Sequence, residues 1–396
     1  MHDVVVVGGG PAGCYAASLL GQRGFDVHLI EEHPVIGEPV DCSGVIGAEA
    51  FTALGCADSL KLGEIHDLTL VSPSDLQVHF SPPSALAYIV DRSAFDRAIA
   101  AKTLAAGVTF HLGWTAFQVG VSHDGVEVWA RHTRNGHGTN GNGCLKLRGS
   151  ILVLAGGPRF KFQGQLGMGK PGNFLKTAQT EVAFRGRQRT TVLMGSAVAP
   201  KSFAWIVPFT KGSAVSARVG VSAKVGAIPY LKKLLERLYR NGELDSADAS
   251  IRSWVIPVSP LRRTYAERVM AVGDAAGQSK PTTGGGIFYA LLSARAAAET
   301  AGTALESRDF SAAAMSRYEI GWRKRLGREI KMGAFFRRLA ERLTDQEIDD
   351  LFRVVLSDGV LPAVTKRARF DWHWDVISFA LRHPALGRIF LKGLFR

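Results

Sequence analysis

The chain has 396 residues, 46% of them hydrophobic, which is too long for one simple core and suits two intertwined domains with an appendage. It contains no run of about 18 consecutive apolar residues, which argues against a membrane-spanning helix, and its four scattered cysteines favour free thiols in a reducing compartment over disulfides or a metal site. The formal net charge of +13 comes with 44 glycines and no nucleic-acid-binding motif, so we expect a basic globular protein that does not bind nucleic acid.

The amino-terminal segment predicts a strand, a glycine-rich turn, a helix and a second, parallel strand. The strand covers residues 4–7, the helix roughly 13–23, and the second strand 25–32. Because a strand begins almost at once, we expect no signal peptide and a cytoplasmic protein.

The later elements follow in chain order. The pattern predicts a helix and a strand within 91–113, two alternating strands around an exposed Gly/Asn-rich loop at 132–143, a β-rich segment over 176–223, and an amphipathic helix over 228–242. A strand and loop at 268–277 precede a helix over 284–302, and the chain is predicted to be helical from about residue 306.

The first turn has the spacing G-x-G-x-x-G. In such a turn, the first glycine permits the bend, the second lets the backbone approach a pyrophosphate, and the third allows the helix to pack closely. Glu31 ends the second strand 18 residues after Gly13, where a carboxylate accepts hydrogen bonds from ribose hydroxyls; Glu32 is the alternative in the adjacent register. The predicted dinucleotide contacts in the turn are Gly8, Gly10, Pro11, Ala12 and Gly13.

A second motif indicates which dinucleotide is bound. The segment RVMAVGDAAGQSKPTTGGGI places Gly273 and Asp274 after a strand and before a helix, and it resembles the second flavin fingerprint of glutathione-reductase-type flavoproteins. This resemblance implies FAD, with Asp274 at the ribityl chain and pyrophosphate and the helix N-terminus facing the isoalloxazine. A helix N-cap is a compatible role for Asp274.

Several segments together resemble the geranylgeranyl reductase family, which belongs to the wider group related to para-hydroxybenzoate hydroxylase. Besides the two fingerprints, they are DRSAFDRAIA at 91–100, EPVDCSGVIG at 38–47, SFAWIVPFTKGSAVSARVGV at 202–221 and PTTGGGI at 281–287. The resemblance covers most of residues 1–300. It implies that Arg92 lies near the flavin, with an ion pair to Asp91 or Asp96 as the structural alternative. It also implies backbone contacts to the flavin ring from Gly284, Gly285, Gly286 and Ile287.

The implied fold is α/β, with a glutathione-reductase-type FAD-binding Rossmann domain, an inserted β-rich substrate domain and a helical carboxyl-terminal region. The expected boundaries are 1–60, 90–165 and 264–305 for the discontinuous FAD domain, 61–89 and 166–263 for the substrate domain, and 306–396 for the basic helical region. One departure is informative. Hydroxylases of the wider group usually carry Asp-Gly after the third flavin-domain strand, whereas this chain has Gly156-Gly157-Pro158, which weakens a hydroxylase interpretation.

The resemblance implies FAD-dependent saturation of C=C bonds in a geranylgeranyl (polyprenyl) chain on a lipid, quinone, chlorin or diphosphate carrier. An isolated alkene must be held against the flavin in a dry slot and must receive a proton. Cys42 is the candidate proton donor or flavin-facing thiol, because a buried thiol stays protonated; simple packing is the alternative. The candidate substrate-lining residues, for which a core role is the alternative, are Trp205, Pro208 and Phe209.

Two other functions stay open. One is an FAD-dependent monooxygenase or halogenase of the same fold, although the halogenase run Trp-x-Trp-x-Ile-Pro is not found in the sequence. The other is a membrane-docked flavoprotein that transfers electrons to a partner. Because only one dinucleotide fingerprint of the first kind is present, the electron donor is either transiently bound NADPH or reduced ferredoxin.

The carboxyl-terminal third is basic. Residues 317–342 carry nine Lys/Arg against three Glu, around an apolar stripe that includes Tyr318, Trp322 and Leu326 and that we expect to pack on the protein body. Aromatic residues among cations in 370–396 favour a helix lying on anionic lipid, at the inner face of a membrane. The same positive charge suits an acidic ferredoxin.

Overall fold

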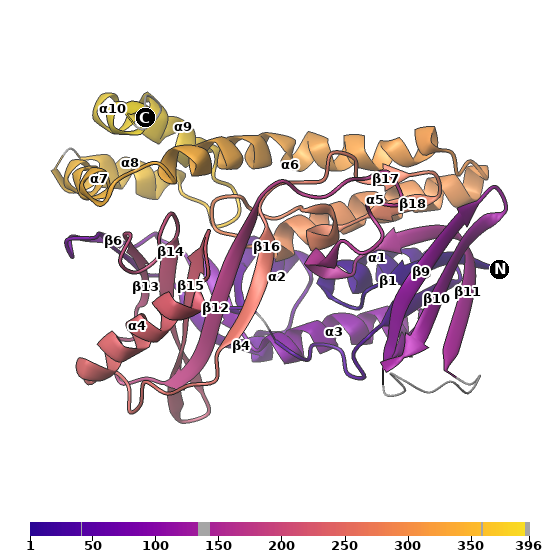
Figure 1. Ribbon diagram of the computed structural model, residues 1–396, viewed down its shortest axis with the longest axis horizontal. Helices are drawn as coiled ribbons and strands as arrows, with labels where there is room; N and C mark the ends of the chain where they lie inside the picture. The colour runs from indigo at the N-terminus through magenta and orange to yellow at the C-terminus, as the bar shows by residue number, and fades with distance from the viewer. Residues whose placement is uncertain (41, 134–142, 358, 393–396) are drawn as a thin grey trace. The chain divides into compact units, whose positions relative to one another are not determined.

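The computed structural model describes residues 1–40, 42–133, 143–357 and 359–392 (Figure 1). It divides into two compact units, each built from separated segments of the chain. The first unit comprises residues 1–40, 92–173 and 257–330, and the second comprises 41–91, 174–256 and 331–396.

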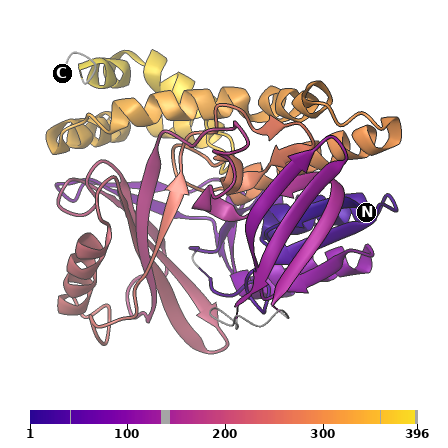
Figure 2. The ribbon, with the colours of Figure 1, turned by 45° about the vertical axis from the view of Figure 1, so that its right-hand side comes forward.

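The first unit contains an eight-stranded sheet. Five strands run parallel in the order β18, β11, β1, β2, β8, and β17 pairs antiparallel with β18 at one edge. Strands β9 and β10 extend β11 by antiparallel pairing and lie side by side with it (Figure 2). The bounds are β1 (His2–Val7), β2 (Val27–Glu31), β8 (Thr109–Leu112), β9 (Trp114–Ser122), β10 (Gly125–His132), β11 (Cys144–Leu154), β17 (Tyr265–Ala266) and β18 (Val269–Ala271).

The predicted strands of this unit are confirmed, and the predicted loop between β10 and β11 falls mostly on residues 134–142, which lie outside the described residues. Strand β1 lies between β2 and β11 inside the parallel sheet, and Val4–Val7 are buried, as expected for an uninterrupted valine run in such a sheet. The helices of the first unit are α1 (Pro11–Gly21), α3 (Arg92–Ala105), α5 (Ile287–Ser307) and the first part of α6 (Ala312–Ala340), with short 3-10 turns at η3 (Gly157–Arg159) and η4 (Gly273–Ala276). Helix α1 packs against both α3 and α5.

The second unit contains a seven-stranded sheet and a three-stranded sheet. The larger sheet has the order β16, β12, β15, β14, β13, β5, β6, and the smaller one the order β3, β7, β4. The bounds are β3 (Val45–Gly47), β4 (Lys61–Ile65), β5 (Leu68–Val71), β6 (Gln77–Phe80), β7 (Ala87–Val90), β12 (Phe174–Ala183), β13 (Thr190–Met194), β14 (Phe203–Lys211), β15 (Ala214–Ala223) and β16 (Arg252–Pro257), with α2 (Ala48–Ala53) and η1 (Asp58–Leu60) between β3 and β4.

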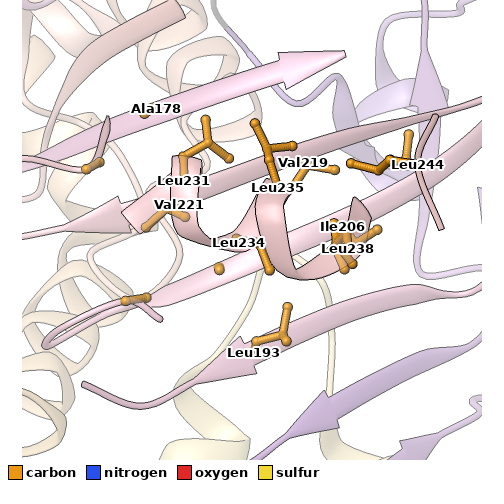
Figure 3. Close-up of a cluster of buried hydrophobic side chains, with 14 of the residues drawn as sticks. Ala178, Leu193, Ile206, Val219, Val221, Leu231, Leu234, Leu235, Leu238 and Leu244 are labelled. Atoms are coloured by element: carbon orange, nitrogen blue, oxygen red, sulfur yellow. The ribbon is translucent and has the colours of Figure 1, made fainter. Parts of the chain in front are cut away.

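Helix α4 (Ile228–Arg240) covers one face of the larger sheet and confirms the predicted amphipathic helix. Its leucines occur at helical spacing, so that Leu231, Leu234 and Leu238 point toward the sheet (Figure 3). They pack on residues such as Ile206 and Val219, which alternate along their strands with residues of the other face. This cluster is the main apolar core of the second unit.

The carboxyl-terminal third is helical, as predicted, but it does not form a third compact region. Helix α6 begins in the first unit and ends in the second, and α7 (Asp345–Ser357), α8 (Val360–Arg367), α9 (Trp374–Arg382) and α10 (Pro384–Lys392) belong to the second. The apolar stripe is buried in its own unit at Tyr318 and Trp322, where the indole N–H of Trp322 donates to Thr264 Oγ1 at 2.9 Å. Among the described residues, no helix combines the length and the apolar character needed to cross a bilayer.

The predicted domain boundary at residue 60 also differs from the observed division, which falls between residues 40 and 41. The expected FAD domain extended through residue 60, whereas β3 pairs with β7 and therefore belongs to the second unit. The second unit consequently contains the Cys42 segment. The physical reason is a long-range strand pairing, which no local pattern announces.

Candidate functional site

The predicted glycine turn lies between β1 and α1. Its backbone conformation and close contacts explain why glycine is needed at Gly8 and Gly13. Gly8 has φ +113°, and a Cβ there would lie 2.4 Å from the Ala155 carbonyl oxygen of the neighbouring strand. A Cβ on Gly13 would lie 1.9 Å from the Gly8 carbonyl oxygen, so only glycine lets α1 start this close to the turn. Gly10, by contrast, has nothing within 4 Å of a Cβ position, and that side of the turn is open.

The turn fits a pyrophosphate. Gly10 precedes α1 in extended conformation and makes no side-chain cap, so the first-turn amides of α1 are available to an anion. Pro11 occupies the first helical position, where its missing N–H costs nothing. Ala12 contributes a small side chain beside Gly273, whose own Cβ position would be 3.1 Å from the Ala12 methyl.

Glu31 is the carboxylate that contacts the glycine turn. Its Oε2 accepts the Gly9 N–H at 2.6 Å, and its Oε1 accepts the His33 N–H at 2.9 Å and contacts His33 Nδ1 at 2.5 Å. Burial raises the pKa of Glu31, but the hydrogen bonds from His33 and Gly9 outweigh it and hold the pKa below its usual range. Glu32 instead pairs with Arg159 at 2.7 Å. The geometry therefore favours Glu31 as the ribose-binding acid.

The second fingerprint meets the first within the same unit. Asp274 lies in η4, directly after β18, and a Cβ on Gly286 would be 3.0 Å from its Oδ1, so the carboxylate stands at the start of α5. Burial raises the pKa of Asp274 to about 6, and the nearby charge of Arg92 partly opposes this. Gly273 packs between Ala12 of α1 and Ala290 of α5.

Arg92 makes the ion pair that was the alternative to a flavin contact. Its Nε and Nη2 donate to the two carboxylate oxygens of Asp96 at 3.1 and 2.9 Å. Both side chains are nearly buried, and Arg92 still acts electrostatically on Asp274. The pair orients the guanidinium without removing it from the neighbourhood of the second fingerprint.

The three glycines before α5 differ in what their amides do. Gly284 has φ +76° and its N–H donates to the Lys280 carbonyl oxygen at 2.8 Å, so this amide is engaged inside the loop. The Gly285 N–H lies 3.4 Å from Thr283 Oγ1. Gly286 precedes the first helical residue, Ile287, without a side-chain cap. The helix start at Gly286 and Ile287, rather than Gly284, thus offers amides to a ligand.

Residues outside the sequence prediction support this site. Gln278 accepts the Gly273 N–H at 2.9 Å and donates to Tyr318 Oη at 2.9 Å, and Tyr318 Oη donates to the Ala271 carbonyl oxygen at 2.5 Å. Lys280 is almost fully buried, and its side chain lies against Gly285, where a Cβ would meet it. The sequence could have indicated Gln278 and Lys280 only through their position in the segment of the second fingerprint. Helix α6 thereby fixes the second fingerprint through buried hydrogen bonds.

Cys42 belongs to the second unit, where two strands hold its segment. Gln179 of β12 donates to the Cys42 carbonyl oxygen at 3.1 Å, and the indole N–H of Trp205 donates to Gln179 Oε1 at 3.3 Å. Arg218 of β15 donates through Nη1 to the carbonyl oxygens of Ser43 and Val90 at 2.8 and 3.0 Å.

The thiol itself is partly exposed, and the Gly44 N–H donates to its Sγ at 3.4 Å. Gly44 has φ +68°, and a Cβ there would lie 2.0 Å from Arg218 Nη1, so glycine is required for the guanidinium to reach the segment. Arg218 also lies over the Phe209 ring, with Cζ 4.7 Å from its centroid. Gln179 and Arg218 were not predicted, because only the pairing of β12 with β15 brings them to this segment.

The three predicted substrate-lining residues do not share one face of β14. Trp205 and Phe209 lie on the side that packs against the three-stranded sheet, in a cluster with Ile65, Ala87 and Ile89. Pro208 is one position out of phase with Phe209 in an unshifted register, so it points to the opposite face. Trp205 rests on Gly220, where a Cβ would lie 2.2 Å from the indole.

A cavity of about 900 Å³ opens elsewhere in the second unit. Its lining combines Pro82, Pro83, Lys366, Arg369 and Trp372, and none of the predicted site residues lines it. It is therefore separate from the predicted polyprenyl-binding residues.

Comparison with known proteins supports a flavoprotein of the predicted kind. Residues 6–41 match the family described as an NAD(P)-binding Rossmann-like domain. The chain is 29% identical over 366 residues to digeranylgeranylglycerophospholipid reductase 2 from Methanothermobacter thermautotrophicus, covering 89% of this chain and 91% of that protein. It is 29% identical over 367 residues to digeranylgeranylglycerophospholipid reductase from Methanocaldococcus jannaschii, covering 89% and 90%.

Solved structures show the same fold. A geranylgeranyl bacteriochlorophyll reductase-like protein from Thermoplasma acidophilum matches 99% of both chains with a TM-score of 0.84 and 22% identity. A flavin-dependent brominase matches 100% of this chain and 98% of its own with a TM-score of 0.68 and 18% identity. Together, these similarities confirm the predicted fold class and the resemblance to geranylgeranyl reductases.

Proposed function

We propose that this chain is an FAD-dependent reductase that saturates the C=C bonds of geranylgeranyl chains carried by a glycerophospholipid. The observation that carries the proposal is the similarity to digeranylgeranylglycerophospholipid reductases, which extends over 89% of the chain at 29% identity. The geometry of both fingerprints suits a dinucleotide. Among the carriers that the sequence left open, the phospholipid is the one that these relatives' names state.

The first unit holds FAD in this proposal. The uncapped amino end of α1 binds the pyrophosphate, Glu31 binds the ribose, and the residues around Asp274 and Gly286 bind the flavin half. FAD, once reduced, supplies the hydride that is added to the alkene. The protein contributes binding, orientation and exclusion of water.

Hydride addition to one alkene carbon requires a proton on the other. We assign this proton to the Cys42 thiol, which gives up its S–H and later regains a proton from water, so that each C=C gains two hydrogens. The Gly44 N–H points at Sγ and stabilises the transient thiolate. Gln179 and Arg218 keep the segment in place through its carbonyl oxygens.

Trp205 and Phe209 contribute an apolar wall for the polyprenyl chain. They extend the apolar cluster of the second unit, and Trp205 stays partly exposed. An apolar slot favours an unactivated alkene over water. Pro208 has no part in this wall, because it lies on the other face of β14.

The electron donor is NADPH or reduced ferredoxin, as the sequence leaves open. The positive net charge of +13 favours an acidic protein donor. Anaerobic mixing of the oxidised FAD-loaded protein with each donor separates the two, because only the competent donor bleaches the flavin absorbance at a rate above that of substrate turnover.

The decisive experiment uses the FAD-loaded protein, reduced anaerobically with dithionite and supplied with digeranylgeranyl glycerophospholipid. Mass spectrometry should show a gain of two hydrogens for each saturated double bond. Polyprenyl quinone and geranylgeranyl diphosphate serve as parallel substrates that test the carrier. A lack of mass gain on all three would overturn the proposal. Oxygen-dependent modification of an aromatic substrate without alkene reduction would establish the monooxygenase or halogenase alternative.

A further inference from the structure

Three side chains meet at the amino ends of β1 and β2, at the opposite ends of these strands from the glycine turn. His2 begins β1, and Asp26 and His28 flank the first residue of β2. His2 Nδ1 lies 2.8 Å from Asp26 Oδ2, and His28 Nε2 lies 3.3 Å from Asp26 Oδ1. The two imidazole rings stack with centroids 3.5 Å apart. Asp26 thus contacts both histidines, with one carboxylate oxygen toward each.

His111 supports this cluster from the neighbouring strand. Strand β8 pairs in parallel with β2, and His111 Nε2 lies 2.9 Å from His28 Nδ1. A hydrogen bond at Nδ1 fixes the ring orientation of His28 and directs its Nε2 toward Asp26. Metal-binding histidines characteristically have a partner of this kind on their second nitrogen.

The separations fit a transition-metal ion. His2, Asp26 and His28 each offer one possible metal ligand atom, and these three atoms all lie within 4.8 Å of one another. Two ligands at about 2.0–2.1 Å from a tetrahedral zinc ion are roughly 3.3–3.4 Å apart, close to the observed His28–Asp26 separation. The His2–Asp26 separation requires a small widening, which the exposed Asp26 side chain permits.

We propose that His2, Asp26 and His28 bind one divalent transition-metal ion of the zinc type, with His111 as the residue that positions His28. Two imidazoles and one carboxylate suit Zn²⁺ or Co²⁺ better than Mg²⁺ or Ca²⁺, which prefer oxygen ligands. Water completes the coordination. Because the ligands come from two neighbouring strands and the residue before one of them, the bound ion ties β1 to β2 at their amino ends.

The sequence predicted no metal site, and the reason is topological. His2 lies 24 residues before Asp26, so no short ligand spacing occurs. The cluster forms only because β1 and β2 are parallel and adjacent, which aligns their amino ends. The site is independent of the proposed reductase activity.

The test uses untagged, FAD-loaded protein freed of metal with a chelator. Titration with ZnCl₂ in a calorimeter should give one equivalent, and CoCl₂ should give the visible absorption of a tetrahedral centre. Zn²⁺ should also raise the melting temperature. His2→Gln and Asp26→Asn should each weaken Zn²⁺ binding by at least about 100-fold, and His111→Gln by about 10- to 100-fold.

His66→Gln is the matched control, because His66 is also paired with a carboxylate, Glu64, but in the second unit and without a second histidine. It should leave Zn²⁺ binding unchanged. The proposal is overturned if the wild-type protein takes up neither Zn²⁺ nor Co²⁺, or if His2→Gln and Asp26→Asn bind them as the wild type does. The wild-type titration decides the matter even where a variant proves unstable.

Discussion

Asp274 carries a buried carboxylate whose proposed contact with FAD favours ionisation, whereas its burial disfavours ionisation. Burial raises its pKa to about 6, above the ordinary value of 3.8, so its ionised form destabilises the folded apoprotein. This penalty is fully present above about pH 6 and disappears as the pH falls below about 4. Asp274→Asn should therefore stabilise the apoprotein at pH 8 by about 1–2 kcal/mol, a value reduced for partial solvent screening.

Urea unfolding of the apoprotein at pH 8 and pH 4 checks this, and the stabilisation should vanish at the lower pH. The same variant should bind FAD about tenfold more weakly in a flavin-fluorescence titration, because it loses an ionic acceptor. Asp245→Asn is a suitable control, since Asp245 is an exposed partner of Arg185 in the second unit. An equal change in unfolding free energy at both pH values would contradict the argument.

Cys42 is the residue on which the proposed proton transfer rests. Cys42→Ala should reduce the rate at which substrate reoxidises prereduced flavin by about 10²- to 10⁴-fold, the range typical of a lost general acid. FAD affinity should be unchanged, because the thiol belongs to the second unit and the dinucleotide fingerprints to the first. Cys144→Ala, at an exposed free cysteine, should behave as wild type. Unchanged turnover in Cys42→Ala would leave the thiol a packing role.

Arg218 is a residue that acts through the position of the Cys42 segment. The residue is 6% exposed, and its planar guanidinium donates from Nη1 to two carbonyl oxygens while Nε pairs with Glu181. Lysine keeps the charge but not this fork, so Arg218→Lys should lower kcat/KM by about tenfold without changing FAD affinity. Arg185→Lys, at an exposed ion pair, is the control and should have no effect. Steady-state kinetics of the Arg218→Lys variant and the wild type measure this effect. Equal kcat/KM values for the two proteins would contradict the positioning role of Arg218.

At the scale of elements, two glycines in the turn between β1 and α1 have different roles. Gly13 allows close packing of α1, whereas Gly10 leaves space for a ligand. A Cβ on Gly13 meets the Gly8 carbonyl oxygen, so Gly13→Ala should prevent α1 from docking and destabilise the protein by several kcal/mol. Gly10 has ordinary negative φ and open space around it, so Gly10→Ala should fold normally. Its methyl group would instead obstruct the approach of the pyrophosphate and lower FAD affinity at least about tenfold.

Circular dichroism melting and flavin binding, measured on both variants, check the two roles. The expected pattern is a lower melting temperature for Gly13→Ala and an unchanged one, with weaker binding, for Gly10→Ala. If Gly10→Ala bound FAD as tightly as the wild type, the open side of the turn would not be where the pyrophosphate lies.

The elements also explain what could be predicted from the sequence. The positions of Glu31 at the end of β2 and of Asp274 after β18 were predictable, because glycine spacing and buried strands are local patterns, whereas their contacts to FAD stay predictions. The opposite orientation of Pro208 was available from strand alternation alone. Gln179 and Arg218 were not, because their approach to the Cys42 segment depends on pairings far apart in the chain. The His2–Asp26–His28 cluster was hidden for the same reason.

At the scale of the whole molecule, the positive charge and the carboxyl-terminal helices raise the question of lipid contact. The apolar faces of α9 and α10 are largely occupied by the protein, with Ile377 and Phe390 buried and Phe390 against Phe336. Leu391 nevertheless stays 51% exposed beside two exposed cations of α10, Arg388 and Lys392. The end of the segment predicted to lie on lipid, residues 393–396, is outside the described residues. We therefore predict that charge, more than a long apolar face, governs contact with lipid.

We accordingly expect the protein to bind vesicles that contain about 30% phosphatidylglycerol at least about tenfold more tightly than neutral phosphatidylcholine vesicles. Each cation near an anionic surface contributes about 1 kcal/mol, and salt screens the attraction, so 0.5 M NaCl should release most of the protein. Leu391→Asp should weaken binding further, whereas Leu104→Asp, at a leucine of α3 that is 56% exposed, should not. Cosedimentation with vesicles measures the effect of lipid charge, the effect of salt and the effect of each substitution. Equal binding to neutral and anionic vesicles would contradict the expected role of charge in lipid binding.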